Sequence, residues 1–203
     1  MSKSTMYISI DVEADGPIPG PFSMLQIGAA MFHPDHYLVG EEAGPQVRGT
    51  FQANLAPLPG ATTDPDTMAW WAKQDPAVWE AVTRSPGDPK TVMEEFIQWV
   101  NDICRVDNAR PVIVGYPVTY DFMFVYWYTV NFVGFPAPFG FQGLDIKTMA
   151  MDRMGCEFRQ ASKRRMPKRW FKGAPPHTHL AVEDAIGQGA LFMNMLLEAR
   201  DAK

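Results

Sequence analysis

An apolar stretch near the N-terminus, Tyr7–Val12, contains one acidic residue, Asp11, and is followed directly by a second, Glu13. Tyr, Ile and Val favour β-strands, and the glycines and prolines of residues 16–20 end a strand. On a strand, Asp11 and Glu13 point to the same face. Two buried carboxylates are costly unless something compensates them, and a divalent cation does so because hard cations bind carboxylate oxygens. A solvated strand end is the alternative interpretation.

The remainder of the chain predicts alternating strands and helices. Short apolar runs predict further strands over residues 22–32, 50–55, 111–115 and 144–146, with a polar excursion over residues 33–48. Helix start signals and apolar residues three and four apart predict helices over residues 64–71, 76–82, 89–104, 119–132, 147–154 and 180–200. This order predicts an α/β fold with a mixed sheet, in which three antiparallel strands come first and parallel strands are added later.

Length and composition restrict the class of protein. A chain of 203 residues can bury a sizeable core, and we predict one domain over residues 1–203. No apolar run approaches the length of a membrane helix, and residues 1–6 are too short and polar for a signal peptide. The two cysteines, Cys104 and Cys156, have no metal-like spacing and favour a reducing compartment, hence a cytoplasmic protein.

The charge distribution is uneven. The net charge of −5 argues against a generally basic nucleic-acid binder. Residues 153–172, called the basic segment below, hold eight Lys or Arg and one Glu, so that they carry +7 and leave −12 for the remainder. A basic segment on an acidic body can attract a polyanion to one place. The alternative interpretation of the basic segment is a solvated loop that binds no polyanion.

Three more residues can join the first acidic pair. Asp121 follows the predicted strand at 111–115, and Asp184 lies in the first turns of the last helix, although either acid could simply favour a helix start. His179 lies five residues before Asp184, about 140° away on a helix, so we expect it on the preceding loop. His177 and His179 do not predict structural zinc, because no Cys or third His has suitable spacing.

These residues carry a resemblance to a known family. Residues 11–16, Asp-Val-Glu-Ala-Asp-Gly, resemble the first motif of the DEDD 3′–5′ exonuclease superfamily. Asp121-Phe122 resembles the second motif, and residues 179–184, His-Leu-Ala-Val-Glu-Asp, resemble the third motif of its histidine branch, DEDDh. Residues 68–74, with two tryptophans, are similar to a segment of the small bacterial and phage exoribonucleases related to RNase T. The stretch before the second motif departs from the family pattern. Many relatives have His-Asn a few residues before the second-motif Asp, whereas residues 115–120 here are Gly-Tyr-Pro-Val-Thr-Tyr.

The resemblance implies a fold, an activity and roles for five residues. The fold is the RNase H-like (DnaQ-like) mixed sheet of about five strands flanked by helices. The activity is metal-dependent hydrolysis of phosphodiester bonds from a 3′ end with two Mg²⁺ or Mn²⁺ ions. Asp11 would bridge both ions, Glu13 and Asp184 would hold the nucleophile-side ion, and Asp121 the leaving-group side. His179 would be the general base for the attacking water, with an ordinary pKa near ~6.5 that suits the role.

Substrate contacts are predicted around the first motif and in the basic segment. The turn over residues 16–24 lies beside the acids and can hold a 3′ terminus. Bases can stack on aromatic side chains, for which Phe22 and Trp71 are the candidates, although tryptophans at helical spacing are often core. Arginines of the basic segment would follow the phosphates. The predicted substrate-binding residues are Gly16, Phe22, Met24, Leu25, Trp71, Arg164, Arg165 and Arg169.

The leading hypothesis is a 3′–5′ exoribonuclease acting on single-stranded RNA or 3′ overhangs. A 3′–5′ DNA exonuclease of proofreading or repair type is the alternative within enzymes, since discrimination depends on contacts to the 2′-hydroxyl that no residue here decides. A non-catalytic nucleic-acid-binding module and a structural interaction protein with acidic strand ends are the alternatives from other classes. Relatives are often homodimers in which the partner's basic segment helps to bind substrate, so a homodimer is a further hypothesis.

Overall fold

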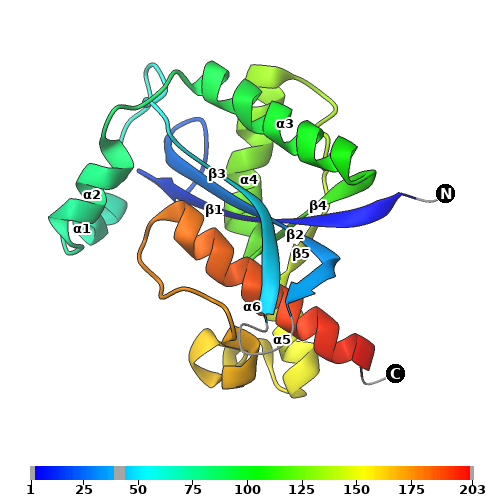
Figure 1. Ribbon diagram of the computed structural model, residues 1–203. Helices are drawn as coiled ribbons and strands as arrows, with labels where there is room; N and C mark the ends of the chain where they lie inside the picture. The colour runs from blue at the N-terminus through cyan, green and yellow to red at the C-terminus, as the bar shows by residue number, and fades with distance from the viewer. Residues whose placement is uncertain (1–2, 39–43, 202–203) are drawn as a thin grey trace.

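A computed structural model describes residues 3–38 and 44–201 and contains a five-stranded mixed sheet (Figure 1). The strands lie in the order β3-β2-β1-β4-β5. β1 pairs antiparallel with β2, and β2 with β3, whereas β1, β4 and β5 run parallel. The strand bounds are Ser4–Ala14 (β1), Met24–Leu38 (β2), Gly44–Asn54 (β3), Ala109–Gly115 (β4) and Gly143–Asp145 (β5). This confirms the predicted α/β class and the change from antiparallel to parallel pairing.

Helices cover both faces of the sheet (Figure 1). The α-helices are Pro65–Trp71 (α1), Pro76–Thr83 (α2), Pro89–Val106 (α3), Val118–Tyr128 (α4), Ile146–Met154 (α5) and Ala181–Asp201 (α6). A π-helical turn, Thr129–Val133 (η1), extends α4, and the 3₁₀ turns Phe158–Gln160 (η2), Lys163–Arg165 (η3) and Lys168–Phe171 (η4) follow α5. The first three helices begin in the same way, with an aspartate that accepts a backbone N–H and a proline directly after it.

The alternation of side chains on β1 decides which residues meet which helix. Ile8 and Ile10 lie in the cluster that contains Phe96 of α3 and Phe124 of α4. Tyr7 belongs to the opposite face, where its ring packs edge to face on Phe192 of α6, with 4.8 Å between ring centroids. Since side chains alternate along a strand, the odd-numbered residues Asp11 and Glu13 also face α6.

Two glycines allow α6 to lie directly on the sheet. A Cβ atom at Gly28 of β2 would overlap the backbone of Ala181 and Val182, at the start of α6. A Cβ atom at Gly189 would overlap the ring of Phe32. The buried Gln26 of β2 fixes the same contact, because its Oε1 accepts the backbone N–H of Ala181 at 2.9 Å. The start of α6 is therefore held close to the sheet.

Three element boundaries differ from the prediction by four residues or more. Residues 33–38, which were predicted to belong to a polar excursion, continue β2. β3 begins at residue 44, six residues earlier than predicted. Residues 39–43 of the predicted excursion lie outside the described residues. Backbone pairing with β3, which residue polarity does not reveal, explains the longer strand. The predicted helix 119–132 is α-helical only to Tyr128 and then π-helical. In residues 3–38 and 44–201, no helix has the length and apolarity needed to cross a bilayer.

Candidate active site

β1 ends beside the start of α6 (Figure 1). Three carboxylates converge at this place. Asp11 and Glu13 come from β1, and Asp184 comes from the first turn of α6. One carboxylate oxygen of each lies within 4.8 Å of the other two. Such an all-oxygen donor set suits a hard divalent cation such as Mg²⁺ or Mn²⁺. The structure thus brings together acids that are more than 170 positions apart in the sequence.

Asp121 lies beside this trio. It occupies the first turn of α4 and is buried. Its Oδ1 accepts the backbone N–H of Val12, between the two acids of β1, at 3.0 Å. Its charge raises the pKa of Asp11, although burial of Asp11 is the larger cause. Together Asp11, Glu13, Asp121 and Asp184 are called the carboxylate cluster below.

Asp11, Glu13 and Asp121 of the carboxylate cluster have pKa values raised above those of ordinary carboxyl groups. Burial raises the pKa of Glu13 to about 8, and the charges of Asp184 and Asp121 add to this effect. Burial likewise raises the pKa of Asp121 to about 7, and it raises the pKa of Asp11 well above its usual range. A bound cation would favour the ionised carboxylates. The electrostatics of the cluster therefore agree with its donor chemistry in pointing to a metal site.

Two residues that the sequence did not single out contact or influence Asp11. Gln188 is buried on α6, and its Nε2 donates a hydrogen bond to Asp11 Oδ1 at 2.6 Å. The ammonium group of Lys163 opposes the rise in the pKa of Asp11 and of Asp121. Gln188 could have been found from its position four residues after Asp184, on the same helix face. Nothing local distinguishes Lys163 from its basic neighbours.

His179 lies on the loop before α6, as expected from its spacing to Asp184. Its backbone φ of 58° falls in the left-handed region, which non-glycine residues rarely adopt. The carboxylate of Asp184 holds this loop by accepting the backbone N–H groups of Thr178 at 3.2 Å and His179 at 3.1 Å. Burial lowers the pKa of His179, and the nearby His177 lowers it further. The charge of Asp184 opposes this shift, but the lowered pKa favours the neutral imidazole, which is the form that can accept a proton.

Of the two tryptophans in α1, the exposed one faces the site. Trp70 is 40% exposed, and its ring lies edge to face with His179, with 5.3 Å between centroids. Trp71 is 4% exposed, packs with Leu25 and donates its indole N–H to the carbonyl of Ala14 at 3.0 Å. The predicted stacking residue, Trp71, is therefore mostly covered, and Trp70 offers the accessible ring. Neighbouring residues on a helix point about 100° apart, and only tertiary packing decides which of them is buried.

The first-motif turn is tight, and part of it is interior. A Cβ atom at Gly16 would overlap the half-buried ring of Phe22, and Tyr120 of α4 donates its hydroxyl to the Gly16 carbonyl at 3.2 Å. Met24 and Leu25 are buried in the core. The burial of Met24 and Leu25 leaves these side chains little surface for the predicted substrate contact, whereas Gly16 and Phe22 stay candidates.

A family model described as the 3′–5′ exoribonuclease Rv2179c-like domain matches residues 6–196. The chain belongs to this family. The 3′–5′ DNA exonuclease Cap18 of Escherichia coli is 29% identical over 188 residues, which cover 92% of this chain and 89% of Cap18. The chain is thus a 3′–5′ exonuclease, a hydrolase acting on the phosphodiester bonds of nucleic acid.

Solved structures support the fold. The nuclease domain of 3′hExo, a DEDDh family member bound to rAMP, has a TM-score of 0.70 at 11% identity, covering 97% of this chain and 94% of that one. A 3′-exonuclease solved with the histone mRNA stem-loop has a TM-score of 0.69 at 10% identity, covering 98% and 84%. At such low identity the likeness shows a shared RNase H-like fold.

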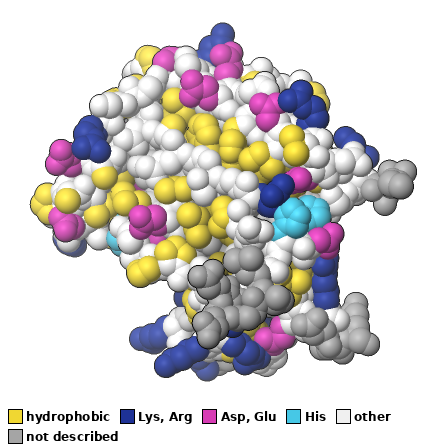
Figure 2. Space-filling view, viewed as in Figure 1, with side chains coloured by type: hydrophobic (Ala, Val, Ile, Leu, Met, Phe, Trp, Pro, Cys, Tyr) yellow, Lys and Arg dark blue, Asp and Glu magenta, His cyan; other side chains and the backbone are white. Residues whose placement is uncertain are grey.

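The basic segment of the exonuclease forms a cationic surface. Figure 2 shows Lys and Arg side chains gathered along the lower edge of the molecule, over the turns that follow α5. Arg164 and Arg165 are exposed there. Arg169, also predicted to contact phosphate, instead forms a two-pronged ion pair with Glu198 of α6, at 2.7 and 2.9 Å. The partner on α6 lies 29 positions away, which sequence spacing could not reveal.

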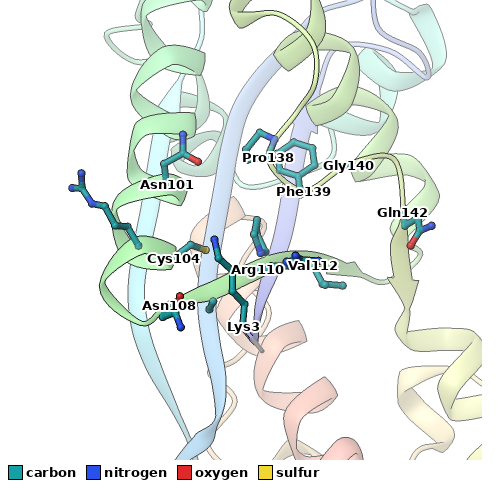
Figure 3. Close-up of a pocket in the computed structure, with 13 residues that line it drawn as sticks. Lys3, Asn101, Cys104, Asn108, Arg110, Val112, Pro138, Phe139, Gly140 and Gln142 are labelled. Atoms are coloured by element: carbon teal, nitrogen blue, oxygen red, sulfur yellow. The ribbon is translucent and has the colours of Figure 1, made fainter. Parts of the chain in front are cut away.

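Two cavities differ in their relation to the exonuclease site. A cavity of about 280 Å³ borders the site and is lined by residues including Lys163, His177, Asp184 and Gln188. A larger cavity of about 680 Å³ lies at the opposite end of β1 and β4, between the end of α3 and residues 138–142 (Figure 3). The larger cavity is therefore separate from the carboxylates.

Proposed function

We propose that the exonuclease releases nucleotides from the 3′ end of single-stranded RNA or of a 3′ overhang, with two divalent cations. The convergence of Asp11, Glu13 and Asp184 beside the neutral His179 is the observation that carries the proposal. The description of the matching family favours RNA. DNA is a second candidate substrate, because the similarity to Cap18, a DNA exonuclease, extends over most of both chains.

The carboxylate cluster would hold Mg²⁺ or Mn²⁺. Asp11 would be shared by the two ions, Glu13 and Asp184 would complete the nucleophile side, and Asp121 would serve the leaving-group side. The cations would supply positive charge for both the attacking and the leaving oxygen of the phosphodiester. Gln188 would keep the Asp11 carboxylate in one orientation through its hydrogen bond.

His179 would accept the proton of the attacking water on a ring nitrogen. Its lowered pKa keeps the imidazole neutral, which is the form that can act as a base. Asp184 would fix where the ring lies, because it holds the backbone of residues 178 and 179. Removal of the carboxylate of Asp184 would therefore disturb both a metal ligand and the base.

The substrate strand would pass between an aromatic and a basic surface. Trp70 is exposed next to His179 and can stack on a base at the 3′ end, with Phe22 on the first-motif turn as a second stacking candidate. Arg164 and Arg165 are exposed on the basic segment and can contact backbone phosphates. Neither contact reads the base, so that both suit a strand of varied sequence.

We also propose a homodimer in which the basic segment of one subunit helps its partner to bind substrate. The exposure of Arg164 and Arg165 supports this proposal. Light scattering on active protein tests the homodimer, and a fully active monomer would contradict it.

We propose a cytoplasmic location because the two cysteines, Cys104 and Cys156, are unpaired, as is usual in a reducing compartment.

The proposed reaction is tested with 5′-labelled RNA and DNA strands, single-stranded or carrying a 3′ overhang. Each strand is incubated with Mg²⁺ or Mn²⁺, with chelator, and with the Asp11→Ala and His179→Ala proteins. We expect a ladder of products from strands that shorten at the 3′ end, and RNA should shorten faster than DNA. The ladder should be absent with chelator and with either variant protein. Faster shortening of DNA would select the second candidate. Retardation of the strands without shortening would instead indicate a binding module.

A further inference from the structure

Two histidines and Asp184 form a second donor cluster at the edge of the active site. A ring nitrogen of His177, a ring nitrogen of His179 and a carboxylate oxygen of Asp184 lie within 4.8 Å of one another. The Nδ1 atom of His177 is 2.6 Å from Asp184 Oδ1, and the two imidazole rings have centroids 4.2 Å apart. No Cys or third His completes the pair in the sequence, but the fold supplies the carboxylate of Asp184 as a third ligand.

This cluster differs in chemistry from the carboxylate trio. Asp11, Glu13 and Asp184 offer three oxygens, but His177, His179 and Asp184 offer two imidazole nitrogens and one oxygen. Zinc is bound in proteins by His nitrogen and carboxylate oxygen, commonly with three protein ligands and a fourth open position. On nitrogen and oxygen ligands, Zn²⁺ also binds more tightly than Mn²⁺. The second cluster therefore favours zinc, and the trio favours Mg²⁺ or Mn²⁺.

The cluster is reachable and adjustable from solvent. The side chain of His177 is 59% exposed, whereas that of Asp184 is 3% exposed. The cavity of about 280 Å³ that borders the site is lined by His177 and Asp184 among others. A cation arriving from solvent thus meets His177 first, and this side chain can shift to bring its nitrogen to bonding distance, about 2.0–2.1 Å for zinc.

We propose that His177, His179 and Asp184 bind a zinc ion that inhibits the exonuclease. Zinc would occupy the imidazole lone pair of His179 that accepts the proton in the reaction. It would also take Asp184, which belongs to both donor sets, away from the activating cations. The inhibition rests on the proposed function of His179 and Asp184, but the binding of zinc does not.

Binding is tested with the full chain and Co²⁺ as a spectroscopic probe for Zn²⁺. Four-coordinate Co²⁺ absorbs visible light much more strongly than six-coordinate Co²⁺, so an ion bound in this cluster should give a visible absorption band. Added Zn²⁺ should displace the Co²⁺ and remove this band. We expect His177→Asn to weaken Co²⁺ binding at least about tenfold. His36→Asn is the matched control, because His36 lies on β2 outside the cluster. Equal binding by wild type and His177→Asn, or loss of binding in His36→Asn, would overturn the site.

Inhibition is tested by titrating Zn²⁺ into the nuclease assay at fixed Mg²⁺. We expect zinc to stop strand shortening, and the His177→Asn protein to need at least about tenfold more zinc for half inhibition. Activation by zinc, or equal inhibition of wild type and variant, would overturn the inhibitory role. A preparation without nuclease activity would count against the proposed function, while the Co²⁺ spectra would still decide whether the site exists.

Discussion

The carboxylate cluster and the basic segment are opposite in construction. The cluster gathers like charges from three distant elements into the interior, where burial raises the pKa values of Asp11, Glu13 and Asp121. The basic segment keeps its charges close in sequence and mostly exposed. Buried like charges are unfavourable until a ligand compensates them, whereas exposed charges are solvated and cost little. Each residue of the cluster is therefore expected to matter individually, and each residue of the segment only in part.

The largest difference is expected when one residue is neutralised in each region. Asp11→Asn keeps an oxygen for the hydrogen bond from Gln188 but removes the charge shared by the proposed cations. We expect loss of about 10³-fold or more in kcat, since metal charge supplies several kcal/mol and 1.36 kcal/mol is tenfold in rate. Arg164→Gln is the control from the basic segment. Similar losses in kcat for both variants would show that the two regions do not differ as described.

The residues that the sequence predicted for one site, and that the fold brings together, share a physical property. They lie at element ends that local signals such as the Gly/Pro turn after β1 set. Asp11 and Glu13 lie near the end of β1, Asp121 and Asp184 in the first turns of α4 and α6, and His179 just before α6. Alternation on β1 places its two acids on one face, and the α/β order brings the strand ends together. The fold class and the convergence of the acids could therefore be predicted from patterns of spacing.

The residues that were missed or misassigned depend on tertiary packing. Trp70 and Trp71 are adjacent and identical in type, and tertiary contacts such as those with Leu25 and the Ala14 carbonyl make Trp71 the buried one. Arg169 resembles its neighbours in sequence, but Glu198 of α6 pairs with it in the fold. Asp184 reaches back to His177 because the loop before α6 folds over its first turn. None of these contacts leaves a periodic signal in the sequence.

The tryptophan pair sharpens the comparison between exposed and buried contacts within a single helix. Trp70→Ala removes an exposed ring beside His179, and we expect a rise in KM of about 5–150-fold with little change in Tm, as stacking on a base is worth ~1–3 kcal/mol. Trp71→Ala removes a buried ring, and we expect ~3–5 kcal/mol of destabilisation in urea unfolding. The reverse assignment, with KM changed by Trp71→Ala alone, would restore the original choice of stacking residue.

The pH dependence of stability tests the buried charges directly. In the folded chain, the pKa values of Glu13 and Asp121 are raised to about 8 and about 7. In the unfolded chain, the same carboxyl groups lose their protons near pH ~4. The folded state then binds more protons, so stability in chelator should fall as pH rises from about 5 to 8. The lowered pKa of His179 acts in the opposite direction, near its ordinary value of ~6.5.

Thermal unfolding at several pH values, with chelator and with Mg²⁺, measures this effect. We expect a Tm that declines with pH in chelator, and a smaller decline with Mg²⁺, because a cation stabilises the ionised carboxylates. Glu13→Gln removes one of the carboxyl groups with a raised pKa and should flatten the profile in chelator. A profile in chelator that is flat or rises with pH in the wild-type protein would contradict the raised pKa values.

The smallest effect is expected from the exposed arginines, and it should appear as salt dependence. Each phosphate contact that is lost lowers the slope of log affinity against log salt by ~0.7 for a single strand. Arg164→Gln combined with Arg165→Gln should therefore lower the slope by about 1.4 and leave kcat unchanged. Arg169→Gln, whose guanidinium already pairs with Glu198, should leave the slope as it is. If Arg169→Gln lowered the slope as much as the double variant, the ion pair between Arg169 and Glu198 would have to open when the strand binds. The basic segment would then act as one cationic surface, in which the arginines have no distinct roles.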